Sequence, residues 1–328
     1  MEEINELKRL AEILAKSDQY RVIERYKKPD FYNVDEDIYI GADNTDKTPT
    51  KRIGVFLDIE ATGVSSEDKV IELGMVKFEY TEDGRIFRLL DEYNSYQDPN
   101  MAIPEHITKL TGITDNMVKN YQIIESEVEN YLQDVDLIIA HNAKFDRTFF
   151  EKTFKSIPPK AWACLMFEVD WKGEDISSHK LEYIAYKYGF FYEGHRAIID
   201  CLAGIHILAQ RLENTDQLVL KQLLTNSGKL TYKLWAVASS YEYKDLLRNR
   251  GYRWNGEQSS KYKAWAIEIP EDKVEEEINY LCSLIYGGSI NIPIDIFDAY
   301  ERFSNSTSKQ TTDKYQDKIE WVKNLCSR

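Results

Sequence analysis

The sequence has few cysteines and no long apolar run, and each shortage excludes a class of protein. Its four cysteines lie far apart and form no metal-binding pair, which predicts reduced, mostly structural thiols. The first twenty residues lack the apolar region of a secretory signal. No stretch approaches the roughly eighteen apolar residues of a membrane-spanning helix. We therefore expect a cytoplasmic protein without a membrane partner.

Basic residues are also fewer than acidic ones. The 328 residues include 42 Lys or Arg and 56 Asp or Glu, for a formal net charge of −14. A chain of this charge repels phosphates on average, which argues against a protein that coats nucleic acid. Residues 229–265 depart from this balance, with eight Lys or Arg and three acids. A nucleic-acid ligand would therefore have to be captured locally, by metal ions or by this basic segment.

The apolar residues that are present suffice for a folded core. They make up 43% of the chain, and its length suits one large domain and a smaller one. Apolar residues at helical spacing predict an amphipathic helix over 3–16. We expect four regions: a helical and extended N-terminal extension (1–50), a main domain (51–215), a small α+β module (216–289), and a polar linker with a C-terminal helix (290–328).

Strands followed by strand–helix alternation predict an α/β fold for the main domain. A turn at Asp83-Gly84 is typical of a hairpin between the second and third strands. The predicted strands cover 53–59, 70–80, 85–93 and 137–140, and the predicted helices lie near 145–155, 179–188 and 196–213. This order indicates a mixed sheet that is covered by helices.

The first chemically informative pair is Asp58 and Glu60, at the end of an apolar strand. Side chains alternate along a strand, so the two carboxylates lie on the same face. Like charges close together in apolar surroundings are costly unless an ion or hydrogen-bond donors compensate them. Alternatively, the strand ends in solvent at Glu60 and both acids are hydrated.

A second group follows the short strand that ends at Ala140. His141 and Asn142 come directly after it, at the sheet edge where α/β proteins usually place their sites. Asn142 is a candidate N-cap of the next helix, and Asp146 lies in the first turn of that helix. Asp146 therefore belongs either to a site or to the acids that the helix dipole favours.

The third group is His195 and Asp200. Two residues five positions apart on one helix lie roughly 140° apart around its axis. They can share a site only if His195 lies in the loop before the helix, and Gly194 would give that loop its freedom. The helix is otherwise apolar, so Asp200 needs a partner. Taken singly, a histidine such as His195 is more often structural than catalytic.

Together and in this order, the three groups resemble the DEDDh (DnaQ-like) 3′–5′ exonuclease superfamily. Within it, the chain is similar to the proofreading epsilon subunit of bacterial DNA polymerase III. The resemblance covers about 53–212, although Ile59 and Ala61 stand where the family more often has threonine. It is carried by Leu57-Asp58-Ile59-Glu60-Ala61-Thr62-Gly63, Ile71-Glu72-Leu73-Gly74, Ile103-Pro104 with Leu110-Thr111-Gly112-Ile113-Thr114, Ala140 through Asp146, and His195-Arg196-Ala197 with Asp200.

The resemblance implies a ribonuclease H-like three-layer fold with a mixed five-stranded sheet. It also implies a 3′–5′ exonuclease that releases 5′-mononucleotides and uses two Mg²⁺ or Mn²⁺ ions. Asp58, Glu60 and Asp200 would hold one ion, and Asp58 with Asp146 the second, since hard cations prefer oxygen ligands. His195 would act as the general base. Contacts to the terminal nucleotide are implied for Ala61, Thr62, Gly63, Leu110, Thr111, His141, Asn142 and Phe145.

The small module adds aromatic rings to the basic segment. Trp254 and Trp265 are interleaved with cations such as Arg253 and Lys263. This composition is typical of surfaces that stack unpaired bases, and we take these four residues as candidate nucleic-acid contacts. Alternatively, the module uses its tryptophans to build a small core.

Three hypotheses about function follow from the sequence. The first is an exonuclease that acts on nucleic acid with a free 3′ end, with single-stranded DNA as the expected substrate and DNA replication or repair proteins as candidate partners. The second is an exoribonuclease that acts on RNA 3′ ends. The third is a catalytically inactive nucleic-acid-binding protein on the same fold.

Overall fold

The structure, a computed structural model, describes residues 2–30, 32, 50–256, 262–288 and 290–304. They divide into two compact units, Met1–Asn226 and Ser227–Arg328. The predicted C-terminal helix and most of the connector before the main domain lie outside the described residues. No helix within these ranges has both the length and the apolar character needed to cross a membrane.

The first unit is built on a mixed five-stranded sheet. Its strands are β2 (Arg52–Ala61), β3 (Val70–Tyr80), β4 (Ile86–Tyr96), β5 (Leu137–Ala140) and β6 (Trp162–Cys164), in the order β4-β3-β2-β5-β6. β2, β3 and β4 are antiparallel neighbours, whereas β5 and β6 join in parallel. The predicted α/β class and mixed five-stranded sheet are confirmed. β6 was not predicted from the residue pattern because three residues are too few to show a period.

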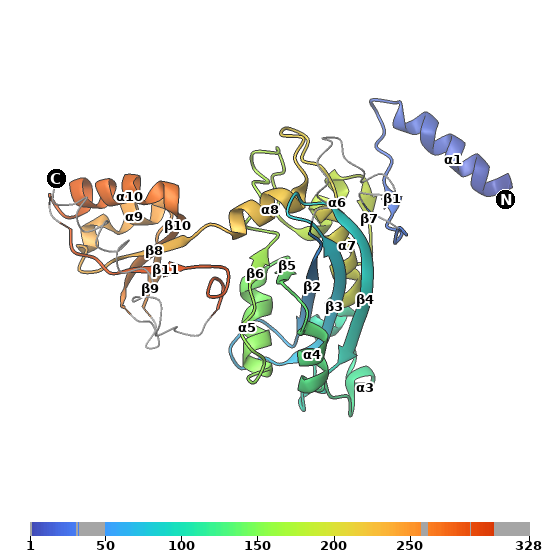
Figure 1. Cartoon of the computed structure of the whole chain (residues 1–328), viewed down its shortest axis with the longest axis horizontal. Coiled ribbons are helices and arrows are strands. Elements are labelled where there is room, and N and C mark those ends of the chain that lie inside the picture. The colour runs from blue at the N-terminus through green and yellow to red at the C-terminus, as the bar shows by residue number, and fades with distance from the viewer. Residues whose placement is uncertain (1, 31, 33–49, 257–261, 289, 305–328) are drawn as a thin grey trace. The chain divides into compact units, whose positions relative to one another are not determined.

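Helices cover both faces of this sheet (Figure 1). They are α2 (Glu105–Thr111), α3 (Asp115–Val118), α4 (Glu125–Leu132), α5 (Ala143–Thr153), α6 (Leu181–Lys187), α7 (Ala197–Leu208) and α8 (Val219–Ser227). Ile71 of β3 packs with apolar residues of α2 and α3. Gly74, three positions further along β3, lies against α7. Because strand side chains alternate, these contacts are on opposite faces, and the sheet is the middle of three layers.

Residues 21–30 and 32, here called the N-terminal strap, lie against the first unit. Within the strap, β1 (Glu24–Arg25) pairs in parallel with β7 (Phe190–Phe191). The Arg21 guanidinium donates hydrogen bonds to the carbonyls of Tyr186 and Lys187 at the end of α6. Tyr26 packs against the ring of His206 on α7. The helix α1 (Glu2–Ala15) precedes the strap, where an amphipathic helix was predicted. The strap was not predicted, because it forms only through these distant contacts.

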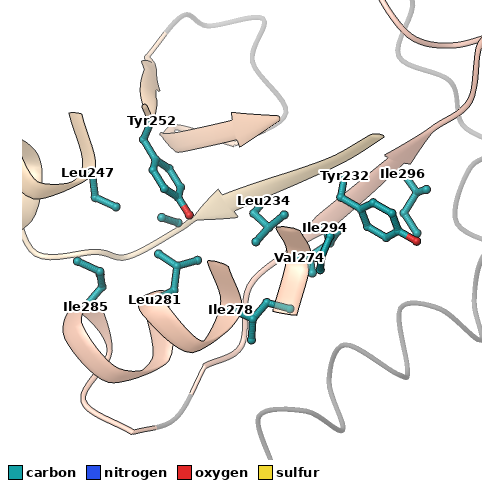
Figure 2. Packing of buried hydrophobic residues seen from close by; sticks show 11 residues of the cluster. Tyr232, Leu234, Leu247, Tyr252, Val274, Ile278, Leu281, Ile285, Ile294 and Ile296 are labelled. Carbon is teal, nitrogen blue, oxygen red and sulfur yellow. The ribbon is translucent and has the colours of Figure 1, made fainter. Parts of the chain in front are cut away.

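The second unit contains an antiparallel four-stranded sheet in the order β11-β8-β10-β9. Its strands are β8 (Thr231–Ala236), β9 (Arg253–Asn255), β10 (Ala264–Pro270) and β11 (Ile294–Phe297). Its helices are α9 (Lys244–Arg250) and α10 (Val274–Tyr280), with short helical turns η2 (Tyr241–Tyr243), η3 (Glu271–Lys273) and η4 (Leu281–Ile285). Side chains from the strands and helices, such as Leu234, Leu247 and Ile278, form one core (Figure 2).

β11 lies in the segment for which we predicted a polar linker. Ile294 and Ile296 are both buried, and they pair with Leu234 and Tyr232 of β8. The linker prediction was therefore wrong for this strand, because two apolar residues beside a polar stretch are a weak signal until a partner strand is present. We propose that the small α+β module includes β11 and therefore ends no earlier than Phe297.

Candidate active site

Strand β2 places Asp58 and Glu60 in half-buried positions at one end of the sheet. Ala61, the next residue, is buried, so the strand does not end in solvent at Glu60 as the alternative explanation required. Carboxylate oxygens of Asp58, Glu60 and Asp200 all lie within 4.8 Å of one another. The fold therefore brings together three of the four carboxylates that were predicted to bind metal.

A glycine lets α7 approach the sheet closely enough to deliver Asp200. A Cβ atom at Gly74 would lie 2.5 Å from the carbonyl carbon of Ala197, in the first turn of α7. Gly74 pairs with Asp58 across β3 and β2, so α7 begins close to the Asp58 carboxylate. The absence of a side chain at Gly74 thus allows the contact between helix and strand on which the cluster depends.

Two hydrogen bonds hold the Asp200 carboxylate in place. Its Oδ2 accepts the backbone N–H of Arg196 at 3.0 Å, and its Oδ1 accepts the hydroxyl of Tyr192 at 3.1 Å. Tyr192 follows β7, the short strand that pairs with the N-terminal strap. The carboxylate is therefore fixed both by its own helix and by the segment before it.

Asp146 reaches the same cluster from the first turn of α5. β5 pairs with β2 only from Gly54 to Phe56, so the backbone N–H of Ile59 lies beyond that pairing. The Oδ1 atom of Asp146 accepts this N–H at 3.0 Å, and the side chain is only 2% exposed. Burial raises the pKa of Asp58, and the charge of Asp146 raises it further. An exposed acid that is present only because the helix dipole favours it would be neither buried nor bonded to a neighbouring strand.

Among the described residues, Asp58 and Glu60 lack the hydrogen bonds that partly compensate the charges of Asp146 and Asp200. Burial, reinforced by the neighbouring carboxylates, raises the pKa of Glu60 and Asp146 to about 8 and that of Asp200 to about 6. It also raises the pKa of Asp58. In the part of the chain that the structure describes, no donor is hydrogen-bonded to the carboxylates of Asp58 or Glu60. Divalent cations would supply the missing positive charge, and this donor set of oxygens fits Mg²⁺ or Mn²⁺.

His195 lies before the start of α7, as the spacing to Asp200 required. The residue itself adopts the left-handed conformation, with a φ of 63°, whereas Gly194 was expected to provide the turn. Gly194 instead leaves space, because a Cβ there would lie 3.3 Å from Oε1 of Glu182. The imidazole Nε2 of His195 is 3.4 Å from that same oxygen. Glu182 of α6 therefore lies beside the ring, a contact that the sequence did not predict.

Glu72 of β3 is a further charged residue beside the cluster, and its side chain is fully buried. Its carboxylate accepts hydrogen bonds from the Arg196 guanidinium at 3.0 and 3.3 Å and from the backbone N–H of Ala197 at 3.1 Å. These bonds tie the start of α7, and with it His195 and Asp200, to the sheet. No role was predicted for Glu72, although a charged residue inside an apolar central strand is a usable signal.

Residues 55–208 match the family model described as Exonuclease. These residues form an exonuclease-family domain. The match agrees with the resemblance inferred from the sequence motifs. It covers the five residues predicted to be catalytic: Asp58, Glu60, Asp146, His195 and Asp200. It leaves the N-terminal strap and the second unit outside the exonuclease domain.

The curated relatives are much longer than this chain. The PolC-type DNA polymerase III of Clostridium perfringens is 35% identical over 161 residues, 47% of this chain and 11% of that protein. The PolC-type DNA polymerase III of Caldanaerobacter subterraneus is 29% identical over 203 residues, 58% of this chain and 14% of that protein. The chain therefore spans only about a seventh or less of these relatives.

Two solved nuclease structures are similar to part of the chain. Exonuclease X in complex with 5′ overhanging duplex DNA has a TM-score of 0.40 and 19% identity, and the match covers 52% of this chain and 98% of that one. The nuclease domain of 3′hExo, a DEDDh family member, bound to rAMP, has a TM-score of 0.42 and 18% identity, and the match covers 51% of this chain and 94% of that one.

The exonuclease domain presents the residues implied to contact the nucleotide in different ways. Leu110 is 51% exposed at the end of α2 and offers an apolar surface. The hydroxyl of Thr111 donates to the carbonyl of Ile107, and that of Thr62 donates to Asp68. Both threonines are buried, so their side chains support the loops. Any contact they make to a substrate would have to come from their backbone.

Gly63 has a comparable supporting role in the loop after β2. A Cβ atom there would lie 2.6 Å from Oδ2 of Asp68, so a larger residue would displace that carboxylate. Asp68 also accepts the backbone N–H of Ser65 at 2.8 Å, which closes the loop. Ala61 is buried at the start of the same loop.

The remaining predicted contacts lie at the start of α5. Burial lowers the pKa of His141 to about 4, so its ring is neutral near neutral pH. Asn142 occupies the N-cap position, but its side chain makes no capping hydrogen bond, and the predicted cap was wrong in that respect. Phe145 is half-buried, with its ring 4.8 Å from that of Phe149.

Proposed function

We propose that the chain is a metal-dependent 3′–5′ exonuclease that hydrolyses terminal phosphodiester bonds of single-stranded DNA and releases 5′-mononucleotides. The observation that carries the proposal is the group of carboxylate oxygens from Asp58, Glu60 and Asp200 within 4.8 Å of one another. Asp146 extends this group through its hydrogen bond to the backbone of Ile59. Acidic oxygens gathered in this way inside an exonuclease-family domain are suited to hold two divalent cations.

Each carboxylate has a proposed place in this site. Asp58, Glu60 and Asp200 would hold one Mg²⁺ or Mn²⁺, and Asp58 and Asp146 would hold the second. Bound cations in such a site lower the pKa of a water molecule and stabilise the leaving 3′ oxygen. The chain's own residues position the substrate phosphate and move the proton.

His195 is the proposed general base. An imidazole can accept a proton near neutral pH, and its position at the start of α7 puts it beside Asp200. Its backbone is held in the left-handed region, and its ring contacts Glu182. Both features support a ring whose orientation is set before the substrate arrives.

DNA is the proposed substrate because curated relatives of this chain are DNA polymerases by name. Their replicative class also makes DNA replication or repair proteins the candidate partners of this chain. A degradation assay would test both the reaction and the substrate. Matched DNA and RNA oligomers with a 5′ label are incubated with Mg²⁺ or Mn²⁺, and the products are resolved as a ladder.

Shortening of the DNA oligomer from its 3′ end, with loss of the ladder in EDTA, is the expected result. Asp58→Asn and Asp200→Asn should abolish cleavage without unfolding the protein. Glu129→Gln is a matched control, because Glu129 is an exposed acid of α4. Preference for RNA would replace the substrate proposal, and binding without turnover in Mn²⁺ would support an inactive nucleic-acid-binding protein instead.

A further inference from the structure

The second unit exposes aromatic rings that its core does not use. Of the aromatic residues in the basic segment, Trp235 and Tyr252 are buried, at 5% and 0% exposure. Trp254 on β9 is 56% exposed, and Tyr241, the first residue of η2, is 79% exposed. The tryptophan-core explanation therefore applies to Trp235 and Tyr252, but it leaves Trp254 unexplained.

Two sets of contacts link aromatic rings of this unit to cations. The Lys244 ammonium lies 4.2 Å from the ring centre of Tyr241. The Arg248 guanidinium lies 5.9 Å from the ring centre of Trp265. Trp265 pairs with Trp254 across β10 and β9, and their ring centres are 5.9 Å apart. We call Tyr241, Lys244, Arg248, Trp265 and Trp254 the aromatic row.

Local geometry puts these side chains on one surface. Tyr241, Lys244 and Arg248 are separated by three and four positions, the spacing at which helical side chains are neighbours. The Arg248–Trp265 contact then joins this helix face to the sheet. Arg253 is exposed, but it lies on the opposite face of β9 from Trp254, because strand side chains alternate. It is therefore outside the aromatic row.

We propose that the aromatic row binds single-stranded nucleic acid. Bases would stack on Trp254 and Tyr241, and phosphates would lie beside Lys244 and Arg248. The proposal rests on the proposed function in one respect, since the bound strand is taken to be the substrate of the exonuclease domain. Every base has a π-face, so a surface of this kind accepts any sequence, as an exonuclease requires.

Charge and chemistry both favour this ligand. A chain with a net charge of −14 can capture a polyanion only where cations are concentrated, and the row lies within the basic segment. Asp245 lies 3.5 Å from Arg248 and reduces the local positive charge. Phosphate contacts alone would therefore be weak, and stacking on exposed rings must contribute much of the affinity. A duplex does not expose its base faces in this way, whereas a single strand does.

Binding of labelled oligothymidylate and oligouridylate of about twenty nucleotides, measured by fluorescence anisotropy, tests the proposal. The full-length protein is kept in EDTA so that no strand is cleaved. Trp254→Ala should raise the Kd about five- to hundredfold, the usual loss for one stacked base. Arg248→Ala should reduce the slope of log K against log salt by about 0.7, as expected for one lost contact to a single-strand phosphate. Trp254→Ala should leave that slope unchanged.

Leu284→Ala is the matched control, because Leu284 is 56% exposed in the same unit but lies on η4. Its Kd should equal that of the wild type, and thermal melts should show all variants folded. A Trp254→Ala Kd within twofold of the wild type, or no oligomer binding by the wild type, would overturn the proposal. The comparison of the two oligomers distinguishes DNA from RNA as the strand.

Cleavage data separate this proposal from the proposed function. With Mn²⁺, Trp254→Ala should lower kcat/KM on the long oligomer but not on a dinucleotide, because a dinucleotide held at the active site has no further bases to stack on the aromatic row. Binding that depends on Trp254 without any cleavage by the wild type would refute only the exonuclease activity. Cleavage of the long oligomer that is unaffected by Trp254→Ala would refute only the role of the aromatic row.

Discussion

Replacing Gly74 by alanine should lower the proposed nuclease activity about a hundredfold while leaving most of the fold intact. The added Cβ would lie 2.5 Å from the carbonyl carbon and 2.6 Å from the next backbone nitrogen of α7, where ordinary contact begins at 3.4 Å. Backbone cannot rotate away as a side chain can, so the start of α7 must move by about 0.9 Å. This shift displaces Asp200 and His195 from the other carboxylates. A misplacement of about 1 Å can cost roughly a hundredfold in rate.

The assay is the initial rate of shortening of a labelled oligomer, measured for Gly74→Ala beside the wild type. Overpacking also destabilises a protein by about 1–3 kcal/mol, so activity must be compared at equal stability. Val128→Ala provides that comparison, because it removes buried methyl groups from α4, away from α7. We expect Gly74→Ala to lose about a hundredfold in kcat and Val128→Ala to retain nearly all of it. A Gly74→Ala enzyme with wild-type kcat would refute the claim that this close approach positions the site.

Three further perturbations address the charges and the N-terminal strap. Burial raises the folded-state pKa of Glu60 and Asp146 to about 8, above the unfolded values near 4. In the metal-free protein, the contribution of these two groups to the free energy of unfolding should be largest below about pH 4 and should be lost as the pH rises towards 8. Thermal melts in EDTA at a series of pH values measure this loss. Glu72→Gln should lower kcat at least about tenfold, because the partly exposed Arg196 guanidinium loses its counter-charge and α7 its anchor. Deleting residues 1–32 should lower the melting temperature by roughly 5 °C or more, whereas deleting 1–18 should not.

Each of these experiments has its own control and its own contrary outcome. Adding Mn²⁺ should reverse the loss of stability at high pH, since bound cations stabilise the ionised carboxylates. A melting temperature that rises with pH in EDTA would contradict the assigned protonation. Glu79→Gln on the same strand should keep kcat, because Glu79 is paired with Lys51 and Arg88 near the surface. Equal melting temperatures for the two N-terminal deletions would mean that the strap does not stabilise the domain.

Local patterns were sufficient to predict most of the elements that hold the site. β3 and β5 occupy the ranges that their apolar runs predicted, and α7 begins after His195 as the spacing to Asp200 required. β6 and β11 were missed because β6 has only three residues and β11 carries Asp295 between its apolar residues, whereas β5 is an uninterrupted apolar run of four. Short strands without such a run become evident only when a neighbouring strand pairs with them.

The chemical groups of the site can be read from residue types and from the alternation of side chains along a strand. The proximity of these groups in space cannot be predicted in the same way, because it depends on packing between elements that are far apart in the chain. α7 reaches β3 only because Gly74 has no side chain, and Asp146 bonds an N–H that the short strand β5 does not reach. The positions of Glu72 and Glu182 beside the start of α7 are likewise set by tertiary contacts. The sequence alone identifies the acidic residues, but tertiary packing decides which of them lie close together.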